Sequence, residues 1–395
     1  MRFEFHLPTR IIFGPGKLSR IGAEAKRFGK KPLLVTGKRM VEKTGILKRA
    51  IDHLYESGLV PTVFGEIEPN PRVTTIDRGA EIAKKEQCDL ILGLGGGSAM
   101  DAAKGIAVTA LGKGSVWSYT AHWKEGYREP EKALPIGLIP TIAATGSEGD
   151  MVAVISNWET HEKAVLGGKS LMPAFSIVDP ELTFSVPSET TADGGIDIIC
   201  HVLETYFTAK ESSPLSDRFA ESIVITVIEN LRRAMLKGDD LEARSNLSWA
   251  SSLALTGIAS AGLAGGFVIH PIEHALSGHY DISHGRGLAI LLPSVMAYTI
   301  PVFPKRCAQL AERVFGVQDD SMSEEERAEA SVERMVAFLK SVDLSMKLSD
   351  VGIDSSKFEV MAEDTLRIYG NRDGCLENPR KLYRDDIINI LKMSL

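Results

Sequence analysis

The sequence has few of the features that mark secreted, membrane or disulfide-rich proteins. Its 395 residues include only four cysteines, which lie far apart and form no CxxC pair: Cys88, Cys200, Cys307 and Cys375. This pattern excludes a disulfide framework and is typical of reduced thiols. The N-terminus lacks the basic start and apolar core of a signal peptide, and no apolar run reaches the ~18 residues of a membrane helix. We therefore expect a cytoplasmic protein.

The sequence also lacks an excess of positive charge. The chain has 45 Lys and Arg against 52 Asp and Glu, a formal net charge of −7, and no basic run. This balance argues against binding to nucleic acid. With 44% hydrophobic and 25% charged residues, the composition is that of a globular enzyme with more than one domain. A chain of this length needs neither disulfides nor metal to hold a core.

The two halves of the chain differ in their residue patterns. Before Pro187, short apolar runs alternate with amphipathic stretches, which is typical of βαβ units and a parallel sheet. The pattern predicts strands at 31–36, 60–64, 89–94 and 135–140, and helices at 41–57, 75–86 and 99–108. After Pro187 the helical period dominates, with helices expected at 193–209, 214–236, 241–258, 262–298, 304–340 and 355–393. We expect an α/β Rossmann-like domain over 1–185 and an all-helical domain over 186–395.

A glycine-rich turn, GGGS at 95–98, lies between a predicted strand and a predicted helix. Consecutive glycines let the backbone approach an anion, which the N–H groups and dipole of the helix start attract. The alternative is a plain tight turn, but the strand–GGGS–helix order favours phosphate binding. A second loop, PTIAATGSE at 140–148, carries hydroxyl groups that could hold a pyrophosphate or a ribose.

Histidines are concentrated in the helical half. Asp197 and His201 are four residues apart, as are His270 and His274, so each pair lies on one helix face. His284 follows at the end of the same region. A carboxylate with imidazoles suits Fe²⁺ or Zn²⁺ with one position open for substrate. The alternative for each residue is a hydrogen-bonded core side chain. His274 has two possible roles, as a fourth imidazole ligand or as a proton relay.

With these motifs the chain resembles the iron-containing (group III) alcohol dehydrogenase family over nearly its whole length. The resemblance rests on GGGSAMDAAK (95–104), PTIAATGSE (140–148), DPELT (179–183), GGIDIICHVLETY (194–206) and HPIEHALSGHYDISHGRGLAILLP (270–293). The form EHALSGHYDISHG looks most like the butanol dehydrogenase branch. The resemblance implies a dehydroquinate synthase-like fold, with a nucleotide-binding domain followed by a helical metal-binding domain. We also expect a homo-oligomer, in the form of a dimer.

The resemblance implies a set of site residues. The metal ligands would be Asp197, His201, His270 and His284, and His274 would be a catalytic group beside the metal. The metal would be Fe²⁺, with Zn²⁺ as the alternative. The residues implied or proposed as cofactor contacts are Gly95, Gly96, Gly97, Ser98, Asp101, Thr141, Thr145, Lys163, Gly37, Asn70 and Leu182.

The end of the first predicted strand indicates which nicotinamide cofactor is preferred. Members that prefer NAD often have an acid there, whereas this chain has Thr36, Gly37, Lys38 and Arg39. Two cations without a carboxylate favour a 2′-phosphate, so we predict NADP(H) over NAD(H). The alternative is that Lys38 and Arg39 are solvated loop cations.

We therefore expect reversible hydride transfer between a nicotinamide and a small primary alcohol or aldehyde of the butanol type. There are three alternative activities: a dehydroquinate synthase-like lyase, a glycerol-type polyol dehydrogenase and a silent regulator. The lyase needs several cations around a phosphorylated substrate, but the segments flanking His270 and His284 offer only Arg286. A regulator would be expected to lack a metal ligand, and here all four positions are filled. Cys375 could line the pocket, although a buried or exposed thiol is the simpler interpretation.

Overall fold

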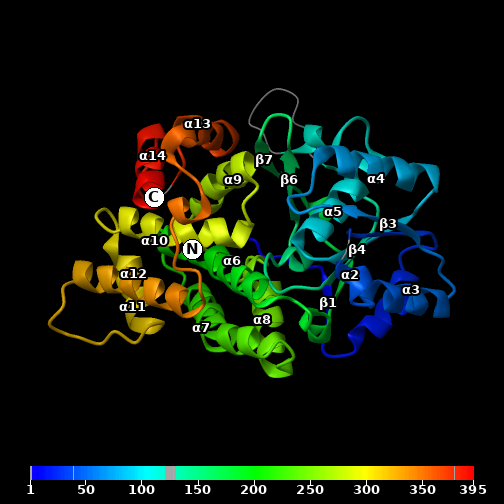
Figure 1. Ribbon diagram of the computed structural model, residues 1–395, viewed down its shortest axis with the longest axis horizontal. Coiled ribbons are helices and arrows are strands. Elements are labelled where there is room, and N and C mark those ends of the chain that lie inside the picture. Colours follow the sequence, from blue (N-terminus) through cyan, green and yellow to red (C-terminus); the bar gives the residue numbers. More distant parts are fainter. Residues whose placement is uncertain (1, 39, 121–127, 129, 378) are drawn as a thin grey trace. The chain divides into compact units, whose positions relative to one another are not determined.

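The computed structural model describes residues 2–38, 40–120, 128, 130–377 and 379–395. Contacts within the chain define two compact units. Their residues can be followed in Figure 1 by colour, which runs along the sequence from blue to red. The sheet unit comprises His6–Val186 and Lys237–Ser252. The helical unit comprises Met1–Phe5, Pro187–Leu236 and Leu253–Leu395. The segment 237–252 therefore groups with the sheet unit, although the sequence pattern placed it in the second domain. The division at 185/186 into functional domains stays a prediction.

The sheet unit is built on a parallel sheet of six strands in the order β1-β8-β5-β4-β2-β3. The strands are β1 (Arg10–Phe13), β2 (Pro32–Gly37), β3 (Thr62–Ile67), β4 (Leu90–Gly95), β5 (Ile136–Pro140) and β8 (Phe175–Val178). The four predicted strands correspond to β2, β3, β4 and β5. The sequence pattern missed the short strands β1 and β8. It also missed the antiparallel hairpin of β6 (Val152–Asn157) and β7 (Glu162–Gly167).

Helices cover both faces of this sheet, which explains why its strands are continuous apolar runs. Leu33 and Val35 belong to a buried cluster on one face, with residues of α4 (Val73–Lys85) and α5 (Gly97–Leu111). Leu34 belongs to the cluster on the other face, with residues of α1 (Ile21–Ala25) and α3 (Ile46–Glu56). The helix predicted over 41–57 is in fact divided into α2 (Met40–Lys43) and α3, because Gly45 adopts a left-handed φ of 73°.

The order of the strands places a topological switch point between β2 and β4. From β2 the chain moves outward to β3, then returns to β4 on the other side of β2. The carboxyl ends of these neighbouring parallel strands lie at one edge of the sheet. In sheets of this kind ligands bind outside the carboxyl ends at the switch point. The fold therefore favours a ligand site at the residues that follow β2 and β4.

The helical unit carries the remaining long helices. They are α6 (Ser188–Phe207), α7 (Pro214–Leu236), α9 (Ile269–Tyr280), α10 (His284–Thr299), α11 (Pro304–Arg313), α12 (Glu324–Ser341), α13 (Phe358–Tyr369) and α14 (Arg384–Met393). Most of α8 (Leu241–Ala254) belongs to the sheet unit. The region predicted to be helical at 262–298 is divided between α9 and α10, and Asp281 between them has a left-handed φ of 51°.

Short 3₁₀ turns connect several of these elements. They are η1 (Lys17–Arg20), η2 (Val116–Tyr119), η3 (Ser147–Gly149), η4 (Lys169–Leu171), η5 (Pro180–Thr183), η6 (Leu348–Val351) and η7 (Ser355–Lys357).

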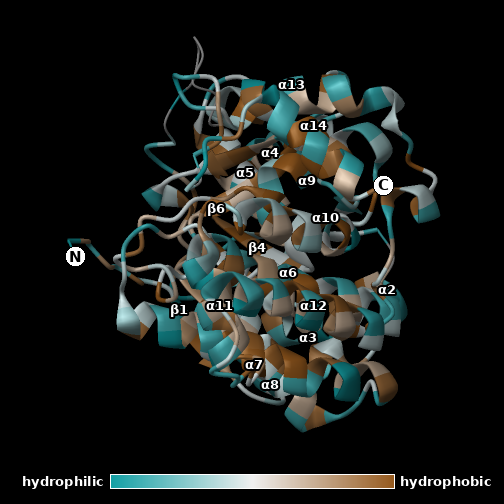
Figure 2. Ribbon diagram, turned by 90° about the vertical axis from the view of Figure 1, so that its left-hand side faces the viewer, coloured by the Kyte–Doolittle hydropathy of each residue, from teal (hydrophilic) through white to brown (hydrophobic). Residues whose placement is uncertain are grey.

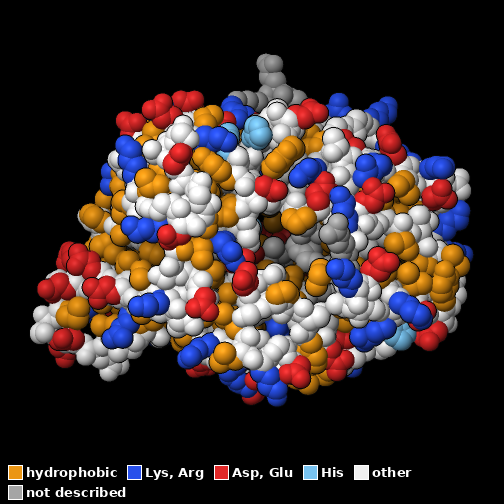
Figure 3. Space-filling view, viewed as in Figure 1, with side chains coloured by type: hydrophobic (Ala, Val, Ile, Leu, Met, Phe, Trp, Pro, Cys, Tyr) orange, Lys and Arg blue, Asp and Glu red, His pale blue; other side chains and the backbone are white. Residues whose placement is uncertain are grey.

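Polar, charged and apolar residues are mixed on the surface of the protein. Figure 2 shows hydrophilic and hydrophobic residues in turn along helices such as α13 and α14, as expected for helices with one buried face. Side chains of both charge signs are interspersed over much of the face shown in Figure 3. Within the described part of the chain, no helix combines the length and apolar character needed to cross a bilayer.

Candidate functional site

The glycine turn lies at the switch point of the sheet. It connects β4 to α5, which begins at Gly97, so the N–H groups of the first turn of α5 are at this edge. The backbone N–H of Thr141 donates to the carbonyl oxygen of Gly95 at 2.9 Å and joins the second loop to the first. A Cβ atom on Gly97 would lie 2.5 Å from Cγ2 of Thr145, closer than real contacts allow. The two predicted cofactor loops are therefore packed directly against each other.

Asp101 and Lys104 on α5 are engaged within the protein. The carboxylate of Asp101 accepts from Oγ of Ser147 at 2.7 Å and from the backbone N–H of Val154 at 2.9 Å. Burial raises the pKa of Asp101, against the opposing effect of Lys104. Lys104 is fully buried and donates to Oδ1 of Asp150 at 2.6 Å. These contacts hold the second loop and β6 against α5, and the role of Asp101 as a cofactor contact stays a prediction.

The other predicted cofactor residues are spread over the sheet unit. Lys38 is exposed directly after β2, and Arg39 lies outside the described residues. Asn70 follows β3 with a left-handed φ of 52°. Lys163 is buried in β7. Leu182 belongs to the hydrophobic cluster that includes Leu34, so its side chain is occupied by core packing.

A second cluster lies in the helical unit, where α6 presents Asp197 and His201 one turn apart. The start of α9 supplies His270, and Pro271 in its first turn needs no intrahelical hydrogen-bond partner. The first residue of α10 is His284. A Cβ atom on Gly285 would lie 2.1 Å from the backbone oxygen of Asp193. Only glycine lets α10 begin so close to α6, and this contact brings His284 to Asp197.

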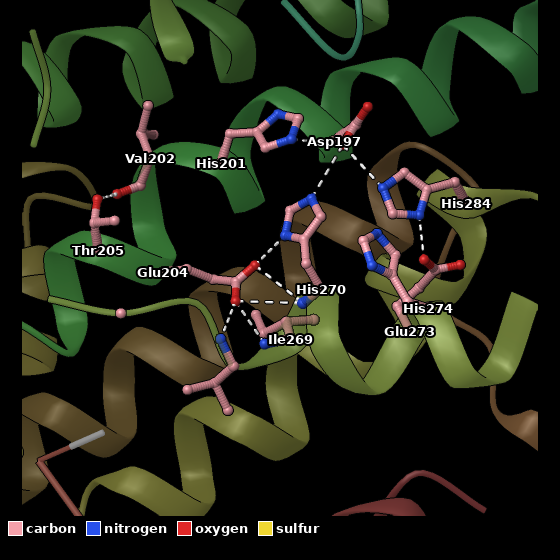
Figure 4. A network of polar contacts seen from close by, with 12 residues as sticks. Asp197, His201, Val202, Glu204, Thr205, Ile269, His270, Glu273, His274 and His284 are labelled. Atoms are coloured by element: carbon pink, nitrogen blue, oxygen red, sulfur yellow. Dashed lines mark hydrogen bonds and ion pairs between the residues drawn. The ribbon is translucent and has the colours of Figure 1, made fainter. Parts of the chain in front are cut away.

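The carboxylate of Asp197 faces the three imidazoles of the other predicted metal ligands (Figure 4). Oδ1 of Asp197 lies 3.6 Å from Nε2 of His201, 3.6 Å from Nε2 of His270 and 3.7 Å from Nε2 of His284. These distances are too long for hydrogen bonds. Atoms that bind one cation at about 2.0–2.2 Å stand about 3.0–3.6 Å apart. The observed distances lie at or just above the upper end of this range, which is compatible with ligands arranged around a shared cation.

Unsatisfied polar atoms support the same interpretation. Among the described residues, Oδ1 of Asp197 and Nε2 of His270 are buried and have no hydrogen-bond partner. Such atoms are costly unless something else binds them. One carboxylate oxygen and imidazole nitrogens are ligands that suit Fe²⁺ or Zn²⁺. The residues present therefore fit the metal that the sequence implies.

The charges of this cluster are strongly coupled. Burial alone would raise the pKa of Asp197, but His201 and the other imidazoles outweigh it and hold the pKa well below its usual range. Burial lowers the pKa of His201 to about 4, despite Asp197. For His270 burial is outweighed by Glu204 and Asp197, which raise the pKa to about 10. The negative charges of Asp197 and Glu204 therefore favour a positive charge at this cluster.

His274 lies beside the cluster. Its ring centroid is 6.0 Å from that of His270 and 5.5 Å from that of His284. Nδ1 of His274 is 2.5 Å from the hydroxyl oxygen of Tyr369 on α13, and burial raises the pKa of Tyr369 well above its usual value. This hydrogen bond fixes the plane of the His274 ring.

Sequence reasoning missed three residues at this cluster: Glu204, Glu273 and Tyr369. Glu204 continues the i, i+4, i+7 pattern of Asp197 and His201, so the helical period could have identified it. Glu273 stands directly before His274. For Tyr369, far along the chain, no local signal exists. Cys375 is buried, with Sγ 3.4 Å from Oδ1 of Asn371.

The parallel sheet with its glycine turn and the clustered imidazoles are typical of metal-dependent enzymes that bind a dinucleotide, and family models identify the class of this chain. The model of the iron-containing alcohol dehydrogenases matches residues 8–180. The model of the C-terminal region of Fe-containing alcohol dehydrogenases matches residues 191–395. The chain belongs to the iron-containing alcohol dehydrogenase family and is an oxidoreductase of the alcohol dehydrogenase and aldehyde reductase class. The family implies iron and a nicotinamide cofactor.

Individual relatives place it near the butanol dehydrogenases. The chain is 39% identical over 398 residues to NADH-dependent butanol dehydrogenase A of Clostridium acetobutylicum, with 100% of both chains covered. It is 31% identical to the NADPH-dependent aldehyde reductase YqhD of Escherichia coli, covering 96% of this chain and 98% of the relative. The crystal structure of NADH-dependent butanol dehydrogenase A from Thermotoga maritima superposes with a TM-score of 0.94 at 36% identity, covering 100% of this chain and 98% of that one.

Proposed function

We propose that this protein interconverts small primary alcohols and their aldehydes, of the butanol and butyraldehyde type, and prefers NADP(H). The observation that carries the proposal is the convergence of three imidazole Nε2 atoms on Oδ1 of Asp197 at 3.6–3.7 Å. Asp197, His201, His270 and His284 would hold Fe²⁺, or Zn²⁺ in its place. In this role the metal supplies Lewis acidity at the substrate oxygen, and the nicotinamide supplies or accepts the hydride.

The protein's own residues bind and orient the reactants. The turn of Gly95, Gly96, Gly97 and Ser98 offers backbone N–H groups to the pyrophosphate of the dinucleotide. Thr141 and Thr145 add hydroxyl groups from the adjoining loop. His274 would accept the alcohol proton and release it toward solvent. Its hydrogen bond to Tyr369 holds the ring in one orientation for this transfer.

The preference for NADP(H) rests on charge after β2. Lys38 is exposed there, and no carboxylate stands beside it in the sequence to repel a 2′-phosphate. The relative from C. acetobutylicum has NADH in its name and the one from E. coli has NADPH, so the family accommodates both. The proposal for this chain therefore depends on its own residues.

A spectrophotometric assay tests the proposal. Native-purified protein, with its metal content measured, is given butyraldehyde with NADPH or NADH, and glycerol and 1,3-propanediol with the oxidised cofactors. We expect faster turnover with butyraldehyde and NADPH than with any other pair. Polyol oxidation as the fastest reaction would favour the glycerol-type alternative, and no turnover with any pair would refute the dehydrogenase.

His274 has its own test. His274→Ala should retain the metal but turn over slowly, with a changed pH profile. An unchanged profile would count against the proton relay. The expected dimer is tested by light scattering in solution.

A further inference from the structure

Two buried glutamates stand behind the histidines of the metal cluster. We propose that Glu204 and Glu273 are positioning residues that fix His270 and His284 with Nδ1 protonated and Nε2 facing Asp197. Each glutamate would do so by accepting a hydrogen bond from Nδ1 of its histidine. This inference rests on the proposed metal ligands and assigns the residues that prepare two of them for binding.

Glu204 is fully buried and is surrounded by donors. It accepts from the backbone N–H groups of Val268 and Ile269, each at 2.5 Å, and hydrogen-bonds to Nδ1 of His270 (Figure 4). The positive end of the α9 dipole stabilises a negative charge at this position. An ionised carboxylate can only accept, so Nδ1 of His270 carries the proton. Nε2 of His270 is then the ring nitrogen that remains to bind a metal.

Glu273 plays the same part for His284. It is fully buried, hydrogen-bonds to Nδ1 of His284 and accepts from Oγ of Ser277. A Cβ atom on Gly287 would lie 2.8 Å from Cγ of Glu273. Glycine at this position of α10 therefore makes the room that the glutamate occupies. The buried carboxylate holds the His284 ring so that Nε2 points to Asp197.

His201 shows the contrast within the same cluster. Its Nε2 lies as close to Asp197 as that of His270. Among the described residues, however, its Nδ1 is buried without a hydrogen-bond partner. Two of the three imidazoles are thus anchored by a carboxylate, and the third is not. An anchoring carboxylate fixes the tautomer of a histidine ligand and increases its basicity.

A change from glutamate to glutamine removes the negative charge and allows this hydrogen bond to be reversed. The amide can donate to Nδ1, which places the imidazole proton on Nε2 and removes the lone pair that binds metal. Residues that orient histidine ligands typically affect metal affinity by about 10–100-fold. Glu273→Gln is the cleaner test, because Glu204 also binds the backbone at the start of α9.

The experiment compares Zn²⁺ affinity in the full-length protein by competition with a chromophoric chelator. Wild type, Glu273→Gln and Glu204→Gln are measured beside a matched control, Glu221→Gln. Glu221 is also a buried glutamate of the helical unit, but it binds Tyr206, Arg218 and Arg313. His270→Ala is included to test the metal site itself. The visible absorption of the Co²⁺-loaded proteins reports the coordination geometry, and circular dichroism reports folding.

We expect about 10–100-fold weaker Zn²⁺ binding and an altered Co²⁺ spectrum in both positioning variants, with Glu221→Gln close to wild type. Wild-type affinity in Glu273→Gln, with His270→Ala weakened, would overturn the positioning role and leave the metal site intact. An equal loss in Glu221→Gln would also overturn it, since any buried glutamate would then have the same effect. Wild-type affinity in His270→Ala would refute the metal site and with it the positioning role. If Glu204→Gln fails to fold, Glu273→Gln decides alone.

Discussion

The protein contains two clusters of buried charge that differ in how closely their members approach. In the sheet unit, Nζ of Lys104 lies 2.6 Å from Oδ1 of Asp150, and each group is paired. In the helical unit, Asp197 faces three imidazoles at 3.6–3.7 Å, and some of these atoms have no hydrogen-bond partner among the described residues. We call the first cluster closed, because Lys104 and Asp150 pair with each other. We call the second cluster open, because its carboxylate and imidazoles stand too far apart to hydrogen-bond to one another, as expected of a binding site.

The largest effect is expected at the open cluster. Asp197→Ala removes the atom shared by the three imidazoles, so metal retention and turnover should be lost while the fold remains. Lewis-acid catalysis is worth several kcal/mol, so the rate should fall by about 10³-fold or more. Elemental analysis and the butyraldehyde assay measure both quantities.

His279→Ala is the matched control for this prediction. His279 is on α9, but its Nε2 is bonded to Asp364 at 2.7 Å. The control should keep its metal. Metal retained in the Asp197 variant would mean that the open cluster is structural after all.

The closed cluster should show the opposite behaviour. Lys104→Met leaves Asp150 buried without its cation, which typically costs about 3–5 kcal/mol of unfolding free energy. Urea unfolding measures this loss, and metal bound per folded chain should not change. The double variant Lys104→Met, Asp150→Asn removes the uncompensated charge and should recover part of the stability. If the single variant is as stable as wild type, the closed cluster contributes nothing to the fold.

The cofactor loops should respond to one added methyl group. In Gly97→Ala the new Cβ would collide with Thr145, which displaces the two loops from each other. We expect the KM for the nicotinamide cofactor to rise about 10–100-fold, since small misplacements at a binding site have effects of this size. Metal content should stay at the wild-type level.

Gly65→Ala in β3 is the control for this loop prediction, because its Cβ would meet only Cγ2 of Thr36 at an ordinary 3.7 Å. An unchanged KM in Gly97→Ala would place the cofactor elsewhere.

The smallest effect is expected at the exposed end of β2. Lys38→Glu replaces a cation that we propose to lie near a 2′-phosphate by a negative charge. Because solvent screens exposed charges, the ratio of kcat/KM for NADPH over NADH should fall by only about three- to tenfold. The same ratio in Lys48→Glu, an exposed change on α3, should not move. An unchanged ratio in the Lys38 variant would mean that Lys38 is a solvated loop cation.

The elements that sequence reasoning located are those with strong local patterns. The apolar runs of β2, β4 and β5 and the glycine turn between β4 and α5 were predicted at nearly their observed positions. The strands β1 and β8 were missed because each has only four residues, too few to show a period. They form through distant pairing, such as Arg10 with Phe175. The break at Gly45 was missed because the apolar period continues across it.

The amino-acid sequence alone shows which types of metal ligand are available and which pairs of them share a helix face. Asp197 and His201 are one turn apart because the helix repeats every 3.6 residues. The meeting of α6, α9 and α10 around Asp197 depends instead on packing between helices, through contacts such as that of Gly285 with Asp193. The same packing also places Glu204 and Glu273 behind two of the histidines. A helix fixes geometry within about a turn, whereas contacts between helices depend on how all their buried faces pack together.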